Sequence, residues 1–512
     1  MGIRKQLAIN FISQVIYSVI NLGISFFLVP HIISSLNASA YAYISLSNDF
    51  INYASLITVA LNSIAGRYIT LAIHKKQNKE ANIYYNSVIV ANIIMASVLL
   101  IPMTLFVIFM DSLINIPANL LGDVRILFII VFTNFIISLI TSVFSSTTFV
   151  TNKLYLSSIA SIGSQIVRCI ALLVLFSLFE TNVCFVGIAS FASTLVIAIS
   201  NYIFTKKLLP QLKFDFKEFD LKYTFEMVKN GVWNSVSKLS GILESGLDLL
   251  LSNLFIGPVA MGIIALPRTI TSIVFSLFGS MASIFNPNIM QAYAKNDFDL
   301  IKRQLFFAIK FVATISNAFI ATFLVVGLEF YKLWVPTENT VFMYMLSFIS
   351  MCSLTIGLPL EPVYVIHTAT NKIKQPAIVC LILSTINIIL VICGVNLVAD
   401  ETLKMVIIYG SSTILGIIKL SLYIPAYTAK IMDEKWHLLY PCILKNIFIV
   451  ALTSVVGLFI KKYLFFDSWI LFFTSSAILG IVFVIVNFFF NFNKEEKKEF
   501  YKVIKKVTKV FN

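Results

Sequence analysis

The chain has 512 residues and a net charge of +14, with 59% hydrophobic and only 12% charged residues. A water-soluble protein has about 25% charged residues, so this chain lacks the polar surface that a soluble fold of its size needs. The positive charge could suit a nucleic acid. However, the basic residues gather between apolar segments, which favours a membrane protein with no nucleic-acid partner.

Mainly apolar segments of about twenty residues recur along the chain, which is the helix length that crosses a hydrocarbon core of ~30 Å. Because a backbone in lipid must satisfy its own hydrogen bonds, we predict an all-α polytopic membrane protein. The first segment follows Met-Gly-Ile-Arg-Lys without a small-residue cleavage motif, so we expect it to be retained. The fourteen predicted transmembrane helices lie at 8–33, 41–66, 84–110, 125–150, 156–178, 184–205, 230–256, 259–290, 304–330, 340–367, 376–398, 404–429, 440–460 and 468–490.

Lysine and arginine are concentrated in every second loop and in the C-terminal tail. By the positive-inside rule, these loops and both termini are predicted to be cytoplasmic. The loops on the opposite side are short. The one sizeable cytoplasmic loop, at 206–229, is rich in Lys and Phe and separates the first six spans from the rest.

The two sides of this loop show an internal repeat. Thr151-Asn152-Lys153 ends the fourth span and Thr370-Asn371-Lys372 the tenth. The turns at 35–40 and 255–260 have the same offset of roughly 220 residues. Six spans per repeat give both halves one orientation, so we predict two six-helix lobes in parallel repeat around a central cavity. The predicted parts are an N-lobe at 1–205, a cytoplasmic linker at 206–229, a C-lobe at 230–430, two extra helices within 431–490 and a basic cytoplasmic tail at 491–512.

Two spans that are equivalent in the repeat each carry a polar stripe. Spacings of three and four residues keep side chains on one face of a helix. Since both stripes recur at the same place in the repeat, we expect them to line the central cavity. The stripes consist of Gln14, Ser18, Asn21 and Ser25 in the first span, and of Asn234, Lys238, Gly241, Ser245, Asp248 and Ser252 in the seventh.

Nine charged residues fall inside predicted spans, where a charge at the bilayer centre costs roughly 2.5–3.5 kcal/mol. Cations in a membrane cavity suit an anionic substrate, because Arg and Lys bind phosphate well. The acids are candidates for coupling transport to H⁺ or Na⁺. The basic residues are Arg67, Arg168, Lys238, Arg268 and Lys419, and the acidic residues are Asp49, Glu244, Asp248 and Glu361.

Some of these charges have a structural alternative. Arg67 lies near the end of its span and could extend to the cytoplasmic surface. Asp248 and Arg268 lie on either side of the Gly257-Pro258 turn, so an antiparallel helix pair would bring them to one depth as an ion pair.

The tail carries an amphipathic pattern. Lysines lie largely on the face opposite the apolar residues, which predicts an interfacial helix on the anionic lipids of the cytoplasmic leaflet. A solvated tail is the alternative. The apolar face consists of Phe500, Val503, Ile504, Val507, Val510 and Phe511.

No group of residues in the sequence has the spacing of a catalytic or metal site. The six cysteines lie in or beside apolar segments without CxxC spacing, and the four histidines lie toward span ends. We therefore predict no enzyme activity, no metal and no cofactor apart from a coupling H⁺ or Na⁺.

The sequence resembles the bacterial polysaccharide flippases of the multidrug/oligosaccharidyl-lipid/polysaccharide exporter superfamily. The resemblance implies two lobes in a V shape and alternating access, by which undecaprenyl-pyrophosphate-linked glycans pass from the inner to the outer leaflet of the bacterial plasma membrane. Many polysaccharide members have twelve spans, and the two extra spans here resemble the arrangement in the peptidoglycan precursor flippase. The similar segments are 10–36, Tyr41 and the Arg67 region for the first two spans, and 246–251, Gly257, Ala260, Gly262, Pro287 and 291–295 for the seventh and eighth.

The leading functional prediction is a flippase for capsule, O-antigen or teichoic-type biosynthesis, with a lipid-linked glycan as substrate and a polysaccharide polymerase as a partner. A cation-coupled multidrug exporter of the same fold is one alternative, although it would favour an acidic or aromatic cavity. A membrane polysaccharide polymerase or glycosyltransferase is another. It would be expected to have a large external loop or a soluble domain, and the sequence has neither.

Overall fold

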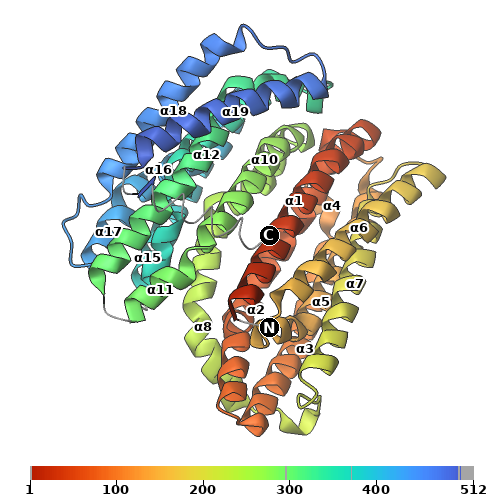
Figure 1. Cartoon of the computed structure of the whole chain (residues 1–512). Helices are drawn as coiled ribbons and strands as arrows, with labels where there is room; N and C mark the ends of the chain where they lie inside the picture. The colour runs from red at the N-terminus through yellow and green to blue at the C-terminus, as the bar shows by residue number, and fades with distance from the viewer. Residues whose placement is uncertain (1–2, 295–296, 371, 494–495, 498–512) are drawn as a thin grey trace. The chain divides into compact units, whose positions relative to one another are not determined.

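The structure, a computed structural model, describes residues 3–294, 297–370, 372–493 and 496–497, apart from a few side chains within helices. This part of the chain is helical and contains no strand, which confirms the predicted all-α fold. Each of the fourteen predicted spans is a helix or a broken helix (Figure 1). The predicted amphipathic helix of the tail lies outside the described residues.

The helices follow the predicted order, with two short ones added. The helices α4 (Met110–Leu113) and α11 (Asn286–Ala294) connect longer ones. The predicted eighth span at 259–290 was too long, since its helix ends at Ser283 and α11 begins at Asn286. The spans are α1 (Ile3–Leu36), α2 (Ala38–His74), α3 (Asn78–Ile108), α5 (Leu121–Val150), α6 (Leu154–Leu178), α7 (Cys184–Leu208), α8 (Leu221–Gly241) with α9 (Asp248–Phe255), α10 (Pro258–Ser283), α12 (Phe298–Trp334), α13 (Thr340–Leu360) with α14 (Tyr364–Ala369), α15 (Lys374–Leu397), α16 (Glu401–Ile418) with α17 (Ile424–Ile431), α18 (Tyr440–Lys461) and α19 (Trp469–Asn491).

Within the described residues, 12 helical stretches are long and apolar enough to cross a membrane. Two of the fourteen predicted spans are not among these 12 stretches. In α1 only Phe26–Leu36 counts, as a shorter apolar helix. The seventh span is interrupted by a π-helical turn at Ile242–Gly246, so neither α8 nor α9 alone is an apolar helix of full length.

The chain packs into two compact units. One comprises Met1–Ala265 and Ala377–Ile408, and the other comprises Leu266–Pro376 and Tyr409–Asn512. The divisions fall inside α10, near the start of α15 and inside α16, and none falls in the linker at 206–229. The seventh span belongs to the first unit, although the sequence repeat puts it in the C-lobe. The predicted lobe boundaries therefore stay a prediction.

In the first unit, α2 packs closely against α8. Gly231 of α8 lies so near α2 that a Cβ atom at this position would come within 1.8 Å of the Ala60 carbonyl oxygen. Small residues allow such close helix contacts in membrane proteins, where packing replaces the hydrophobic effect as the driving force. The close contact brings the polar side chains of both helices into reach of one another.

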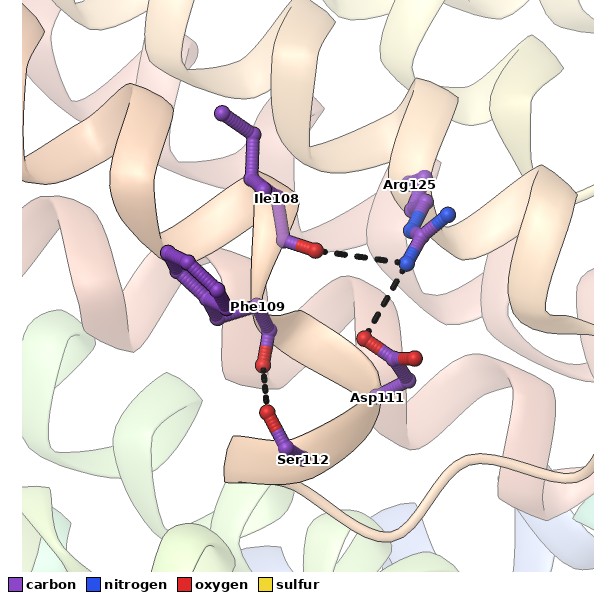
Figure 2. A network of polar contacts seen from close by, with 5 residues as sticks. All are labelled: Ile108, Phe109, Asp111, Ser112 and Arg125. Atoms are coloured by element: carbon purple, nitrogen blue, oxygen red, sulfur yellow. Dashed lines mark hydrogen bonds and ion pairs between the residues drawn. The ribbon is translucent and has the colours of Figure 1, made fainter.

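The loop between α3 and α5 is fixed by polar contacts at both ends. The Arg125 guanidinium bonds the Asp111 carboxylate at 3.1 Å and the Ile108 carbonyl oxygen at 3.4 Å (Figure 2). Farther along, the Asn115 backbone N–H donates to Asn253 Oδ1 at 2.8 Å, and Asn253 Nδ2 donates to the Asn115 carbonyl at 2.9 Å. This reciprocal pair attaches the loop to α9 within the same unit.

In the second unit, α12 is the central helix, and the two appended spans pack on it. Asn317 of α12 bonds Asn446 of α18 at 3.2 Å. The Lys461 ammonium of α18 lies 2.8 Å from the Glu329 carboxylate of α12. Polar side chains hold membrane helices together in this way, so α18 and α19 are integral to this unit.

We predict that Gly231→Ala destabilises the protein, because its methyl group has no room beside the Ala60 carbonyl. Overpacking of this kind costs about 1–3 kcal/mol, so the unfolding temperature of the purified protein should fall by several degrees or more. Gly163→Ala is the matched control, since a Cβ there meets nothing within 4 Å. Equal unfolding temperatures for both variants would contradict the described α2–α8 contact.

Candidate functional site

Four of the nine predicted intramembrane charges lie where a helix is interrupted. Glu244 lies in the π-helical turn Ile242–Gly246, and Asp248 begins α9 directly after it. Glu361 begins a 3₁₀ turn at Glu361–Val363, and Lys419 begins a second π-helical turn at Lys419–Tyr423. Such turns occur frequently at functional sites, and interrupted helices form the binding sites of many transporters. The charges and the breaks thus mark the same positions.

Side chains of neighbouring helices satisfy the backbone groups that the first break exposes. Asn387 of α15 donates to the Glu244 carbonyl at 3.0 Å, and the Tyr53 hydroxyl of α2 donates to the Gly246 carbonyl at 2.6 Å. Ser240 and Ser384 share a further hydrogen bond of 3.0 Å beside the turn. Irregular backbone at membrane depth is tolerated only where such partners exist, so these contacts stabilise the break.

The polar stripe of the seventh span contacts α2 along much of its length. Asn234 Nδ2 donates to Ser63 Oγ at 2.9 Å, and the Lys238 ammonium donates to Asn52 Oδ1 at 3.0 Å. Both Asn234 and Lys238 are half-buried, and Ser245 is exposed. In this conformation the first part of the stripe therefore has partners on α2, and its role in lining a cavity stays a prediction.

The stripe of the first span also meets a neighbouring helix at its start. Ser158 of α6 donates to Gln14 Oε1 at 3.2 Å, while Ser18 bonds the Gln14 carbonyl within α1. Asn21 is half-buried. The Ser25 side chain lies outside the described part of the structure. Gln14 thus takes part in the contact between α1 and α6.

Arg168 lies in a pocket between α2, α5, α6 and α7 of the first unit. The pocket has a volume of about 280 Å³, and its other polar lining groups are amides and hydroxyls. The Arg168 Nε–H is buried and has no hydrogen-bond acceptor among the described residues. None of the described residues that line the pocket is a carboxylate. Because a charge inside a span costs roughly 2.5–3.5 kcal/mol and is usually paired, Arg168 stays a candidate ligand for an anionic group.

Glu361 lies in a smaller pocket of the second unit, with a volume of about 200 Å³. Residues of α10, α11 and α14 form its walls, including Ser283, Asn286 and Thr368. Both helix breaks of this unit, at Glu361 and at Lys419, thus carry a charged residue.

The remaining predicted charges differ in exposure. Arg67 is exposed, Arg268 is half-buried, and Asp49 and Asp248 are buried. Asp248 and Arg268 belong to different units, so their ion pair stays a prediction. The described residues contain no group of three or more His, Cys, Asp or Glu side chains that could hold a metal ion.

The sequence analysis did not identify the amides and hydroxyls that surround Arg168. It also did not identify the side chains that donate hydrogen bonds to the backbone of the interrupted helix. Asn134 lines the pocket with a buried Oδ1 that has no partner in the described part of the chain. Its single amide in the apolar segment Val-Phe-Thr-Asn-Phe-Ile-Ile was a signal that could have found it. Asn387 and Tyr53 carried no comparable signal, because the break that they stabilise is not visible in the sequence pattern.

Comparison with solved structures identifies the fold. A MATE family multidrug transporter of the MOP superfamily in an inward-facing conformation superposes with a TM-score of 0.60 and 14% identity, over 81% of this chain and 99% of that chain. The lipid II flippase MurJ in an inward closed conformation superposes with a TM-score of 0.61 and 15% identity, over 93% and 97%. The chain shares the fold of these two proteins. The resemblance predicted from the sequence is thus confirmed for the fold.

No protein-family model matches the chain. Over nearly its whole length, the chain is similar to the uncharacterized membrane protein EpsK of Bacillus subtilis (strain 168), with 27% identity over 491 residues and 96% of each chain covered. The two superposed structures are a transporter and a flippase.

Proposed function

We propose that the chain is a flippase that moves an undecaprenyl-pyrophosphate-linked oligosaccharide from the inner to the outer leaflet of the bacterial plasma membrane. The product would serve the synthesis of a cell-surface polysaccharide. The observation that carries the proposal is the buried Arg168 Nε–H, which has no acceptor among the described residues, in a chain whose fold is shared with a lipid II flippase. A lipid-linked pyrophosphate is a substrate that needs a cation at membrane depth, because its charge would otherwise oppose passage through lipid.

In this proposal the basic residues in the spans bind the pyrophosphate while the lipid tail stays in the bilayer. Arg168 and Lys238 are the first candidates, and Arg67, Arg268 and Lys419 follow. The acids Glu244, Asp248, Glu361 and Asp49 couple the conformational change to an H⁺ or Na⁺ gradient. Both termini lie in the cytoplasm, the basic tail contacts anionic lipids, and a polysaccharide polymerase receives the product.

The second candidate is a cation-coupled multidrug exporter. It is favoured by the likeness to a MATE family transporter. The five basic residues within the spans oppose it, because organic cations would be repelled by such a path. A polysaccharide polymerase loses support, since the structures with this fold are transporters and a flippase.

We predict that Arg168→Gln and Lys238→Gln each reduce surface glycan in a flippase-deleted host by about tenfold or more. A hydrogen bond to a charged group is worth about 1.5–3 kcal/mol, and 1.4 kcal/mol is a factor of ten. Arg125→Gln is the control, because Arg125 lies in the first turns of α5, pairs with Asp111 and does not line the Arg168 pocket. Normal glycan at normal protein abundance for both test variants would exclude their role with the substrate.

The sequence repeat assigns α2 and α8 to different lobes, and alternating access between these lobes predicts that α8 moves away from α2 during transport, although the two helices pack in one compact unit here. Ser63→Cys and Asn234→Cys place thiols at two side chains whose polar atoms are 2.9 Å apart. In a background without the six native cysteines, a short thiol cross-linker between them should abolish transport, and cleavage of the linker should restore it. Each single cysteine variant treated with the same reagent is the control. Full transport by the cross-linked protein would show that this helix pair stays together throughout the cycle.

A further inference from the structure

The pocket around Arg168 has the composition of an oxyanion site. Polar residues from one face of α5 and one face of α7 line the pocket. Asn134 and Ser138 are four residues apart on α5, and Ser190 and Ser193 are three residues apart on α7, so each pair lies on one face of its helix. All four of the helices that form it belong to the first unit, so the site is complete within that unit. We propose that this pocket binds a single phosphate group, with Arg168 as its charged ligand.

The hydrogen-bonding capacity of the lining groups favours an acceptor-rich ligand. Among the described residues, no hydrogen bond from the hydroxyls of Ser138 and Ser193 is observed within the protein, so both can donate into the pocket. Asn48 uses one amide hydrogen on the Ile44 carbonyl and has a second to give. Together with the guanidinium, these groups present donors to the several oxygens of a phosphate.

The charge and geometry of Arg168 also fit phosphate. A guanidinium offers a planar fork that matches two phosphate oxygens at once. None of the described residues that line the pocket is a carboxylate that would neutralise it or repel an anion. The positive charge is therefore available to a ligand.

The size of the pocket limits what it can hold. At ~30 Å³ for each water molecule, about 280 Å³ holds a phosphate group with several waters. It lies just below the 300–1,000 Å³ that is typical of drug-sized ligands. An oligosaccharide would not fit, so the sugar chain of a lipid-linked glycan would remain outside while one phosphate enters. The inference thus deepens the proposed function, and it rests on that function only for the source of the phosphate.

The test is calorimetric titration of the purified full-length protein in detergent with inorganic phosphate at constant ionic strength. We expect saturable binding that Arg168→Gln weakens by about tenfold or more, as loss of a charged hydrogen bond does. Arg168→Lys should lose less affinity for phosphate, because lysine keeps the positive charge but not the planar group that binds two phosphate oxygens at once. Arg125→Gln should bind as the wild type does, since Arg125 is not in the pocket. Equal affinity in a folded Arg168→Gln variant would overturn the proposal.

A second variant covers the case in which Arg168→Gln fails to fold. The double variant Ser138→Ala and Ser193→Ala keeps the charge and removes two donors, and we expect its affinity for phosphate to fall by about threefold or more. If this variant folds and binds phosphate as tightly as the wild type, the pocket is not the binding site.

Competition distinguishes the source of the phosphate. If dodecyl phosphate displaces inorganic phosphate at a concentration below that of inorganic phosphate, the natural ligand is a phosphate carried by a lipid. If it does not displace inorganic phosphate, the natural ligand is a free anion in the same pocket. Suppose that phosphate binding depends on Arg168 but the Arg168→Gln variant supports normal surface glycan. The phosphate site would then be upheld, and the role of Arg168 in flipping would be refuted. The two proposals can therefore fail separately.

Discussion

The absence of water in the hydrocarbon core of a membrane is the constraint on which the rest of this structure depends, because every polar group at that depth needs a partner in the protein. The chain meets this demand with amides, hydroxyls and ion pairs between helices. The carbonyls of the π-helical turn at Ile242–Gly246 accept from Asn387 and Tyr53. The Lys461 ammonium pairs with Glu329 between α18 and α12. These contacts decide which helices adjoin one another, since apolar side chains gain little by leaving lipid for protein.

Arg168 is one of the described side chains with a buried polar atom that these contacts leave unsatisfied. Its buried Nε–H has no acceptor among the described residues, although it lies in a span and beside several polar side chains. Its place in a pocket that also holds amide and hydroxyl groups makes it a candidate ligand for an anionic group. For this reason the proposed function and the proposed phosphate site both depend on the same residue.

Helix positions followed from the sequence because hydropathy and length reflect the membrane directly. The span predicted at 156–178 is α6 (Leu154–Leu178), and that at 125–150 is α5 (Leu121–Val150). The break within the seventh span was not predictable, because a π-helical turn changes the backbone without changing the composition. The charged residues of the site could be predicted because a charge within an apolar segment is evident in the sequence. Their partners, such as Asn52 for Lys238, depend on helix packing that the sequence pattern does not specify.

The two extra spans belong to the packed fold. The superposition on the lipid II flippase covers 93% of this chain, against 81% for the MATE family transporter. In the second unit, α18 and α19 pack on α12 through Asn317, Asn446 and the Lys461–Glu329 pair. Both spans are therefore packed parts of the second unit.

The most direct test of the central claim is a flipping assay in liposomes. Purified protein would be reconstituted with a fluorescent undecaprenyl-pyrophosphate-linked oligosaccharide, and a membrane-impermeant quencher would report the fraction of label that reaches the outer leaflet. We predict that the wild-type chain moves the label much faster than protein-free liposomes do, and that Arg168→Gln slows this movement. Equal rates with and without the wild-type protein, under both an H⁺ and a Na⁺ gradient, would contradict the account.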